Sequence, residues 1–201
     1  MKCGIIGYPI KKPRSVSLWK KYFSKKNINS KMLEFNFNKN DFNKNLRNLI
    51  QDKEFLASAI TMPYKISIKK YINVMHESSK LSGSTNLIIK YKKKIYGFNT
   101  DISGFIKSVS NKINIKDVVI IGMGGSGYAI FNYLNKKYKK KFILITSKKI
   151  KKQKNIRCFK SIDQAKLDPQ KKLFIINCTP LGSNLDKKFI NKTSISEEVL
   201  K

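Results

Sequence analysis

The stretch VVIIGMGGSGYAI, residues 118–130, decides the fold that this sequence predicts. Its four β-branched residues indicate a buried strand, and they lead directly into three glycines with G-x-G-x-x-G spacing, Gly122, Gly124 and Gly127. Apolar residues at helical spacing follow the last glycine, so the turn joins a strand to a helix. A strand, a glycine turn and a helix in this order are typical of a dinucleotide-binding βαβ unit.

Each glycine of this turn has a physical task in the predicted site. Gly122 allows the tight turn, Gly124 lets the backbone approach a pyrophosphate, and Gly127 permits close packing of the helix on the strand. Free N–H groups at the helix N-terminus favour phosphate binding. An ordinary βα turn would need no ligand, but the strand before and the helix after favour nucleotide binding. The cofactor-binding candidates in the turn are Gly122, Gly124, Gly125, Ser126 and Gly127.

The next expected strand, FILITS at residues 142–147, favours NADP over NAD. An NAD site has an acidic residue about 20 residues beyond the glycines, which accepts from the ribose 2′-hydroxyl. No Asp or Glu occurs between Val118 and Ile162. The strand leads instead into Ser147, Lys148 and Lys149, which suit a 2′-phosphate, although Lys148 could also belong to the general excess of lysine. We therefore expect NADP as the cofactor.

The composition restricts the remaining classes of protein. The 201 residues suffice for one large or two small domains, and a hydrophobic content of 41% permits a packed core. Lys and Arg number 43 against 12 Asp and Glu, which gives a formal net charge of +31. This charge is scattered through every segment and accompanies no aromatic–basic stacking motif. We therefore expect surface charge with weak polyanion affinity and no specific nucleic-acid partner.

Cysteine, histidine and hydropathy patterns bear on location and on metals. Three cysteines with unpaired spacing indicate reduced thiols, and a single histidine, His76, argues against a zinc site or a histidine-based triad. We expect no metal. No apolar run approaches the roughly 20 residues of a membrane span, and the N-terminus leads directly into a strand, without a signal peptide. The sequence predicts a cytoplasmic protein without membrane association.

Short apolar runs alternate with longer amphipathic ones, which predicts an α/β fold with a mostly parallel sheet. In the first half we expect strands at 3–8, 30–37 and 55–61, helices at 15–27, 41–50 and 64–75, and a hairpin at 84–100 turning near 92–94. In the second half we expect a helix at 101–112, strands at 118–121, 142–147 and from 173, and a helix ending near 138.

Three details of this prediction concern helix ends, helix faces and domains. Ser15 and Asp41 are expected to cap their helices, and Leu18, Trp19, Tyr22 and Phe23 are expected to form one apolar face of the first helix. The domain boundary falls within the helical stretch near 101–115, which gives domains at 1–105 and 106–201.

Six motifs, in order, resemble those of the shikimate dehydrogenase family. Besides the glycine turn they are GYPIKKPRSVS (7–17), ITMPYK (60–65), GSTN (83–86), GFNTD (97–101) and NCTPLGS (177–183). Any one of these motifs is a weak signal, but six in the family's order at suitable spacings are a strong one.

The resemblance implies an N-terminal α/β substrate-binding domain followed by a Rossmann-type domain for NADP. It also implies reversible reduction of 3-dehydroshikimate to shikimate, in the chorismate pathway to aromatic amino acids, by a monomer or homodimer. By motif position the resemblance implies that Lys65 and Asp101 are the catalytic pair. The chemistry agrees, because a lysine ammonium can stabilise and protonate a developing alkoxide. The same positions imply substrate binding by Ser15, Thr61 and Asn86, and they place Thr179 near the cofactor.

Three departures from the family pattern leave alternatives open. Pro13 replaces the first of two carboxylate-binding serines, and Ala59 replaces an asparagine that would meet a substrate hydroxyl. A dehydrogenase for quinate or a related ring acid is therefore an alternative. The second half shows only three expected strands, and NKTSISEEVLK (191–201) resembles the start of a further helix. We expect a Rossmann domain incomplete at the C-terminus, in a fragment or a shortened chain, with an inactive nucleotide-binding homologue as the third interpretation.

Overall fold

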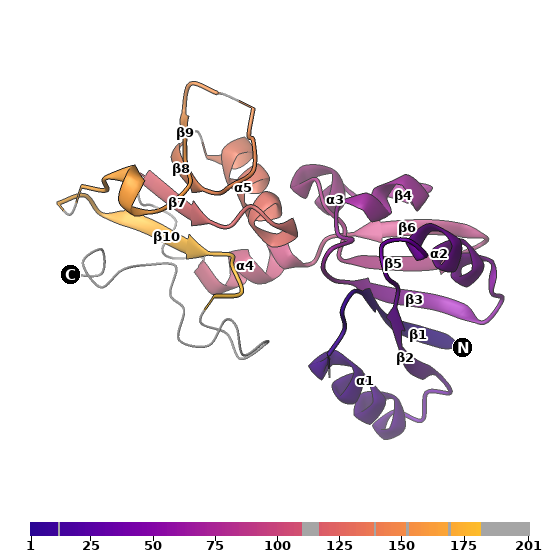
Figure 1. Ribbon diagram of the computed structural model, residues 1–201. Coiled ribbons are helices and arrows are strands. Elements are labelled where there is room, and N and C mark those ends of the chain that lie inside the picture. The colour runs from indigo at the N-terminus through magenta and orange to yellow at the C-terminus, as the bar shows by residue number, and fades with distance from the viewer. Residues whose placement is uncertain (12, 110–116, 139, 152, 169, 182–201) are drawn as a thin grey trace. The chain divides into compact units, whose positions relative to one another are not determined.

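A computed structural model describes residues 1–11, 13–109, 117–138, 140–151, 153–168 and 170–181. They form two compact units, Met1–Asp101 and Ile102–Lys201 (Figure 1). The boundary expected from the sequence, between residues 105 and 106, lies within helix α4 (Asp101–Val109). Residues 110–112 of the expected helix, the loop residues 182–183 and the expected helix in 191–201 lie outside the described residues.

The first unit is built on a six-stranded sheet with the order β2-β1-β3-β5-β6-β4. The strands are β1 (Lys2–Gly7), β2 (Lys31–Asn36), β3 (Phe55–Ile60), β4 (Val74–Met75), β5 (Leu87–Tyr91) and β6 (Lys94–Phe98). β1 runs parallel to β2 and β3, whereas β5 is antiparallel to β3 and to β6. The sheet of this unit is therefore mixed rather than mostly parallel, because the predicted hairpin forms its second half. Lys92 and Lys93 make the hairpin turn with φ values of 46° and 62°.

Helices α1 (Arg14–Lys25) and α2 (Phe42–Gln51) cover opposite faces of this sheet. Adjacent residues of a strand point to opposite faces. Ile5 of β1 packs in a cluster with Val16 of α1, while Ile6 packs in another with Leu46 of α2. Strand β1 thus has one helix on each face.

Most of the apolar face expected for α1 does not pack against the sheet. Leu18, Trp19 and Tyr22 are 65%, 48% and 47% exposed. The helix contacts its core cluster through Val16, which is buried, and Phe23, which is partly buried. These two residues lie seven positions apart, so a narrow stripe that includes Phe23, at the edge of the predicted face, rests on the sheet.

The expected cap Ser15 is wrong, and the expected cap Asp41 is right in position only. Pro13 occupies the N-cap position of α1, so Ser15 lies inside the first turn. Asp41 does precede α2, but with ψ of −6° it already has helical geometry and makes no cap hydrogen bond. Its carboxylate accepts instead from Nδ2 of Asn38 at 2.6 Å. The stretch expected as a helix at 64–75 forms a short 3₁₀ helix, η1 (Ser67–Tyr71), and then β4, and helix α3 (Glu77–Ser82) was not expected.

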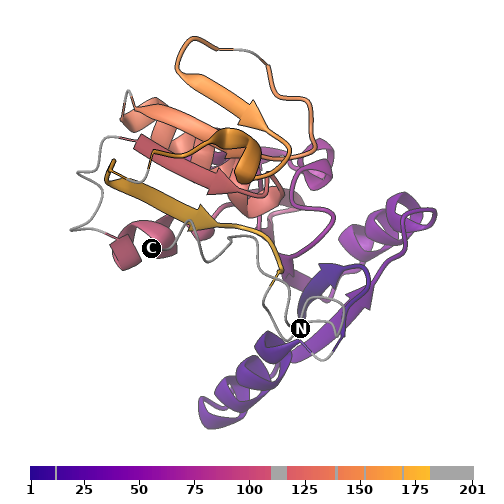
Figure 2. The ribbon, with the colours of Figure 1, turned by 60° about the vertical axis from the view of Figure 1, so that its left-hand side comes forward.

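The second unit contains a four-stranded parallel sheet with the order β10-β7-β8-β9 (Figure 2). Its strands are β7 (Asp117–Ile121), β8 (Lys141–Ile145), β9 (Ile156–Phe159) and β10 (Leu173–Asn177). Strand β9 was not among the strands predicted from the sequence, because IRCF is short and Arg157 and Cys158 are exposed. With it, the described part of this unit has four strands where three were expected.

Alternation along β7 divides the core of the second unit. Val118 and Ile120 pack with residues of α4 and of α5 (Gly125–Lys137). Val119 and Ile121 point the other way and pack with Ile162, beside the short 3₁₀ helix η2 (Asp163–Ala165). Both faces of the strand are therefore buried, which explains its unbroken run of β-branched residues.

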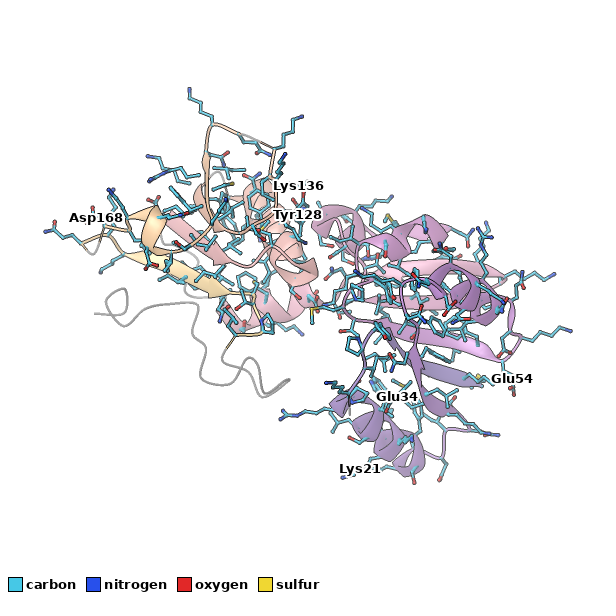
Figure 3. All side chains as sticks on the ribbon, viewed as in Figure 1. Lys21, Glu34, Glu54, Tyr128, Lys136 and Asp168 are labelled. Carbon is cyan, nitrogen blue, oxygen red and sulfur yellow. The ribbon has the colours of Figure 1, made fainter. Side chains whose placement is uncertain are left out.

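Charged side chains extend from the surfaces of both units, as the exposed Lys21, Glu34, Lys136 and Asp168 illustrate (Figure 3). No helix among the described residues is both long enough and apolar enough to cross a membrane.

Truncating a buried and an exposed leucine will test this division between core and surface. Leu46 is fully buried against the sheet and Leu18 is 65% exposed. We expect Leu46→Ala to lower the free energy of unfolding by about 2–5 kcal/mol, and Leu18→Ala to change it by less than about 0.5 kcal/mol. Urea titration followed by circular dichroism measures both. A loss for Leu18→Ala as large as that for Leu46→Ala would show that α1 packs through the face predicted from the sequence.

Candidate active site

An ion pair joins Lys65 and Asp101 in the first unit. Nζ of Lys65 lies 2.7 Å from Oδ2 of Asp101, and the side chains are 15% and 27% exposed. Lys65 follows the carboxyl end of β3, whereas Asp101 begins α4, just after β6. The sheet therefore brings together two residues that are 36 positions apart in the sequence.

Asn86 supplies the second contact to this carboxylate. Its Nδ2 donates to Oδ1 of Asp101 at 2.7 Å and to Oγ1 of Thr100 at 2.9 Å. The backbone of Asn86 is itself held between two strands, because its N–H donates to the carbonyl of Phe98 and its carbonyl accepts from Ile60. Each oxygen of Asp101 thus has its own donor, one charged and one neutral.

The arrangement suits proton transfer to a small polar molecule. A lysine with about one seventh of its side chain exposed is close enough to solvent to meet a ligand, and its carboxylate partner restricts its orientation. An ammonium group at such a point can stabilise a developing oxyanion and protonate it. Asp101 can accept from a ligand hydroxyl through the remaining lone pairs of its oxygens.

The other two predicted substrate residues lie in neighbouring segments. Thr61 directly follows β3, and its backbone N–H donates to the carbonyl of Ile6 in β1 at 2.9 Å. Ser15 is half-buried in the first turn of α1. Within the described residues, neither hydroxyl hydrogen-bonds with the Lys65–Asp101 pair or with Asn86. Three of the five predicted residues, Lys65, Asp101 and Asn86, are thus linked by hydrogen bonds. The described hydrogen bonds do not link Ser15 or Thr61 to them.

The second unit has a cavity of about 540 Å³ at the carboxyl ends of its parallel strands. It is lined by residues at or just beyond the ends of β7, β8, β9 and β10: Ile121, Gly122, Met123, Gly124, Ile145, Thr146, Ser147, Lys148, Lys160, Ser161, Ile162, Asp163, Thr179 and Leu181. Five predicted cofactor residues line it, namely Gly122, Gly124, Ser147, Lys148 and Thr179. Gly125, Ser126 and Gly127 form the first turn of α5 and are not part of the lining.

The strand order places this cavity where open α/β sheets bind dinucleotides. Counted along the chain, the strands lie in the order 4-1-2-3, so the sheet is extended to opposite sides of β7 by β8 and β10. Ligands bind outside the carboxyl ends of strands at such a switch point. Thr179, in the loop after β10, approaches the glycine turn after β7, and its hydroxyl is engaged by its own turn through Oδ1 of Asn177 at 2.7 Å.

Two glycines of the turn are required by close contacts. Gly122 has φ of +89°, a left-handed conformation that favours glycine. A Cβ on Gly127 would lie 2.0 Å from the carbonyl oxygen of Gly122, so only glycine lets the helix approach the strand this closely. Gly124 is different, because a Cβ built there meets nothing within 4 Å. That open space is where a ligand phosphate can reach the backbone.

Lys160 and Asp163 are lining residues that the sequence did not identify. They follow β9, the strand that was missed, and the register between β8 and β9 brings Lys160 to the same edge as Lys148. The signal that could have found them is the pattern of IRCF followed by polar residues. The cavity therefore contains two lysines and one carboxylate.

Comparison with known proteins gives matches along nearly the whole chain. The family model for the shikimate dehydrogenase substrate binding domain matches residues 5–88. A shikimate dehydrogenase (NADP(+)) of Clostridium botulinum (strain Loch Maree / Type A3) is 32% identical over 188 residues, which are 89% of this chain and 71% of the relative. This chain belongs to the shikimate dehydrogenase family. The fold class and the resemblance predicted from the motifs are confirmed.

Other shikimate dehydrogenases agree with this assignment. A shikimate dehydrogenase (NADP(+)) of Clostridium perfringens is 28% identical over 204 residues, covering 98% of this chain and 74% of the relative. The crystal structure of shikimate dehydrogenase 1 from Peptoclostridium difficile superimposes with a TM-score of 0.80 at 25% identity, covering 99% of this chain and 73% of that one. The chain thus spans roughly three quarters of the length of these family members.

Alanine substitutions at two glycines will test the geometry of the turn. Gly127→Ala places a methyl group against a backbone carbonyl, and we expect it to destabilise the second unit by roughly 3 kcal/mol. Gly124→Ala meets no atom and has an ordinary φ of −77°, so we expect unchanged stability or a gain of roughly 0.4–1 kcal/mol. Thermal unfolding followed by circular dichroism compares them. Equal midpoints for the two variants would contradict the close contact of Gly127.

Proposed function

We propose that this chain is an NADP-dependent shikimate dehydrogenase that interconverts 3-dehydroshikimate and shikimate. The observation that carries the proposal is the Lys65–Asp101 ion pair, braced by Asn86, in a member of this family. In this proposal the unit Met1–Asp101 binds the ring acid and the unit Ile102–Lys201 binds NADP.

The chemistry follows from the charges at the pair. Reduction of a ring ketone adds a hydride to carbon and a proton to oxygen, and NADPH supplies the hydride when it is bound. Lys65 donates the proton to the alkoxide oxygen as it develops, because its ammonium both stabilises that charge and neutralises it. Asp101 orients Lys65 and accepts from a neighbouring substrate hydroxyl. Asn86 holds the other carboxylate oxygen in place and presents its amide beside the substrate.

The cavity of the second unit fits the proposed cofactor. The open space at Gly124 and the first turn of α5, with Gly125, Ser126 and Gly127, would hold the pyrophosphate. Ser147 and Lys148 would hold the 2′-phosphate, with Lys160 as a second cation at the same edge. Thr179 would lie near the nicotinamide. Asp163 lines the same cavity, and the two lysines outweigh its charge.

Ser15 and Thr61 complete the proposed substrate site, where they would meet the carboxylate and a ring hydroxyl.

Position 59 gives a reason to keep a second candidate substrate. The methyl side chain of Ala59 has no polar atom, so it offers no hydrogen bond to a ring hydroxyl. It packs against the apolar cluster of Ile5, Val16 and Met32. Quinate or a related ring acid is therefore the second candidate.

Removing the proposed proton donor will test the reaction. We expect Lys65→Ala to lower the kcat of shikimate-dependent NADP reduction by about 10²–10⁴-fold, with little change in the KM for NADP. Lys70→Ala is the matched control, since Lys70 lies nearby on η1 and is exposed. Absorbance of NADPH measures both variants.

The same assay separates the candidate substrates. Wild-type turnover with quinate and none with shikimate would favour the second candidate. Turnover with neither acid, or retention of full shikimate activity by Lys65→Ala, would contradict the proposed function.

Reversing one charge will test the assignment of the cofactor. Lys148 lines the cavity, whereas the adjacent and equally exposed Lys149 does not. We expect Lys148→Glu to weaken NADP binding by at least about tenfold, since a charge-assisted contact to phosphate becomes a repulsive one. Affinity for NAD should change much less. Lys149→Glu makes the same change in net charge, so an equal loss of NADP affinity in both variants would reveal a general effect of charge.

A further inference from the structure

A buried asparagine, Asn99, hydrogen-bonds both to the backbone of Asp101 and to Ser84. It follows β6, precedes α4 and is 1% exposed. Its Oδ1 accepts from the backbone N–H of Asp101 at 2.9 Å. Its Nδ2 donates to the carbonyl oxygen of Ser84 at 3.1 Å and to Oγ of Ser84 at 2.8 Å. One amide thus holds the backbone of Asp101 and the backbone two residues before Asn86.

The segment that Asn99 holds on its donor side also contacts the lysine. The backbone N–H of Thr85 donates to the carbonyl oxygen of Lys65 at 2.7 Å. The next residue, Asn86, donates to the carboxylate of Asp101. The short run from Ser84 to Asn86 therefore fixes the main chain of Lys65 at one point and the side chain of Asp101 at another. Asn99 is the residue that anchors this run to the first turn of α4.

The surroundings of Asn99 are polar and buried. Five side chains of this cluster are at most 1% exposed: Ser79, Ser82, Ser84, Thr85 and Asn99. Oγ of Ser82 donates to the carbonyl of Ser84 at 2.8 Å, and Oγ1 of Thr85 donates to Oγ of Ser79 at 3.1 Å. The backbone N–H of Asn99 donates to Oγ of Ser78 at 3.0 Å. Because an amide side chain has a donor end and an acceptor end, an apolar residue of the same size cannot serve here.

We propose that Asn99 is a positioning residue that sets the geometry of the Lys65–Asp101 pair. It acts through the backbone of Asp101 and through the Ser84–Asn86 run. The effect of Asn99 on shikimate turnover rests on the proposed function, whereas its effect on the geometry of the ion pair does not. Loss of the amide moves Asp101 and the run that carries Asn86 relative to Lys65, and the pair loosens.

The test measures the reactivity of Lys65 directly. Limiting acetic anhydride acetylates the lysine amines that it can reach, and a lysine held against a carboxylate in a partly buried ion pair is less accessible to the reagent. Peptide-resolved mass spectrometry follows Lys65, with Lys2 as an internal reference, because Lys2 is paired with Asp52 at 2.9 Å in another part of the unit. We expect Asn99→Ala to raise the acetylation rate of Lys65 at least threefold and to leave that of Lys2 unchanged.

Asn73→Ala is the matched control. Asn73 also accepts a backbone N–H through its Oδ1, from Ile95 at 2.7 Å, but at the start of β6 rather than at its end. We expect it to leave Lys65 at the wild-type rate. In parallel, kcat with shikimate should fall about 100-fold in Asn99→Ala, the effect of a displacement of about 1 Å at reacting groups, while the KM for NADP stays the same.

Each result bears on a separate claim. An Asn99→Ala protein whose Lys65 is acetylated at the wild-type rate overturns the positioning role, whatever its turnover. A wild-type protein without shikimate or quinate turnover contradicts the proposed function, and the reactivity of Lys65 still decides the role of Asn99.

A milder variant keeps the test decisive if Asn99→Ala does not fold. In Asn99→Ser, the hydroxyl can still accept from the N–H of Asp101, as serine does at helix N-termini, but it is too short to reach both groups of Ser84. We expect the reactivity of Lys65 to lie between those of wild type and Asn99→Ala. A wild-type rate in Asn99→Ser would overturn the proposal that the contact with Ser84 positions the pair.

Discussion

The pairing of Lys65 with Asp101 is the constraint on which the first unit depends. Both charges are withdrawn from most of the surrounding water, and a partly buried charge without a partner is costly. The pair can form only if the end of β3 and the start of α4 meet, and for that β5 must pair in register with β3 on one side and with β6, which leads into α4, on the other. The antiparallel hairpin in the sheet is therefore part of the site, because it carries Asn86 and leads into Asp101.

The two units use strand ends in different ways. In the second unit four parallel strands bring their carboxyl ends to one edge, and the glycine turn leaves the backbone accessible there. This edge suits an extended anionic ligand, because backbone N–H groups at the glycine turn and two lysines lie there together. In the first unit the mixed sheet places one charged pair among hydrogen-bonded amides and hydroxyls, which suits a small polar ring. The second unit thus presents backbone N–H groups at its cavity, whereas the first presents polar side chains around its ion pair.

Features of this structure that depend on local patterns could be predicted from the sequence. The strand and the glycine turn at 118–130 follow from steric needs of neighbouring residues, and Lys65, Asn86 and Asp101 are found together because each belongs to a motif at a strand end. The exposed face of α1 could not be predicted, since helical spacing does not say which of two adjacent stripes meets the sheet. Strand β9 was too short to be recognised. The buried serines around Asn99 look like an ordinary polar loop until the fold encloses them.

The exposed face of α1 also has an optical consequence. The only tryptophan of the chain is Trp19, which is 48% exposed and has its ring 5.4 Å from that of Tyr22 and 5.7 Å from that of Phe23. Intrinsic indole fluorescence therefore reports on a single helix surface in contact with water. Any molecule that covers this surface would shift the emission to shorter wavelength, so the chain carries its own label for events at α1.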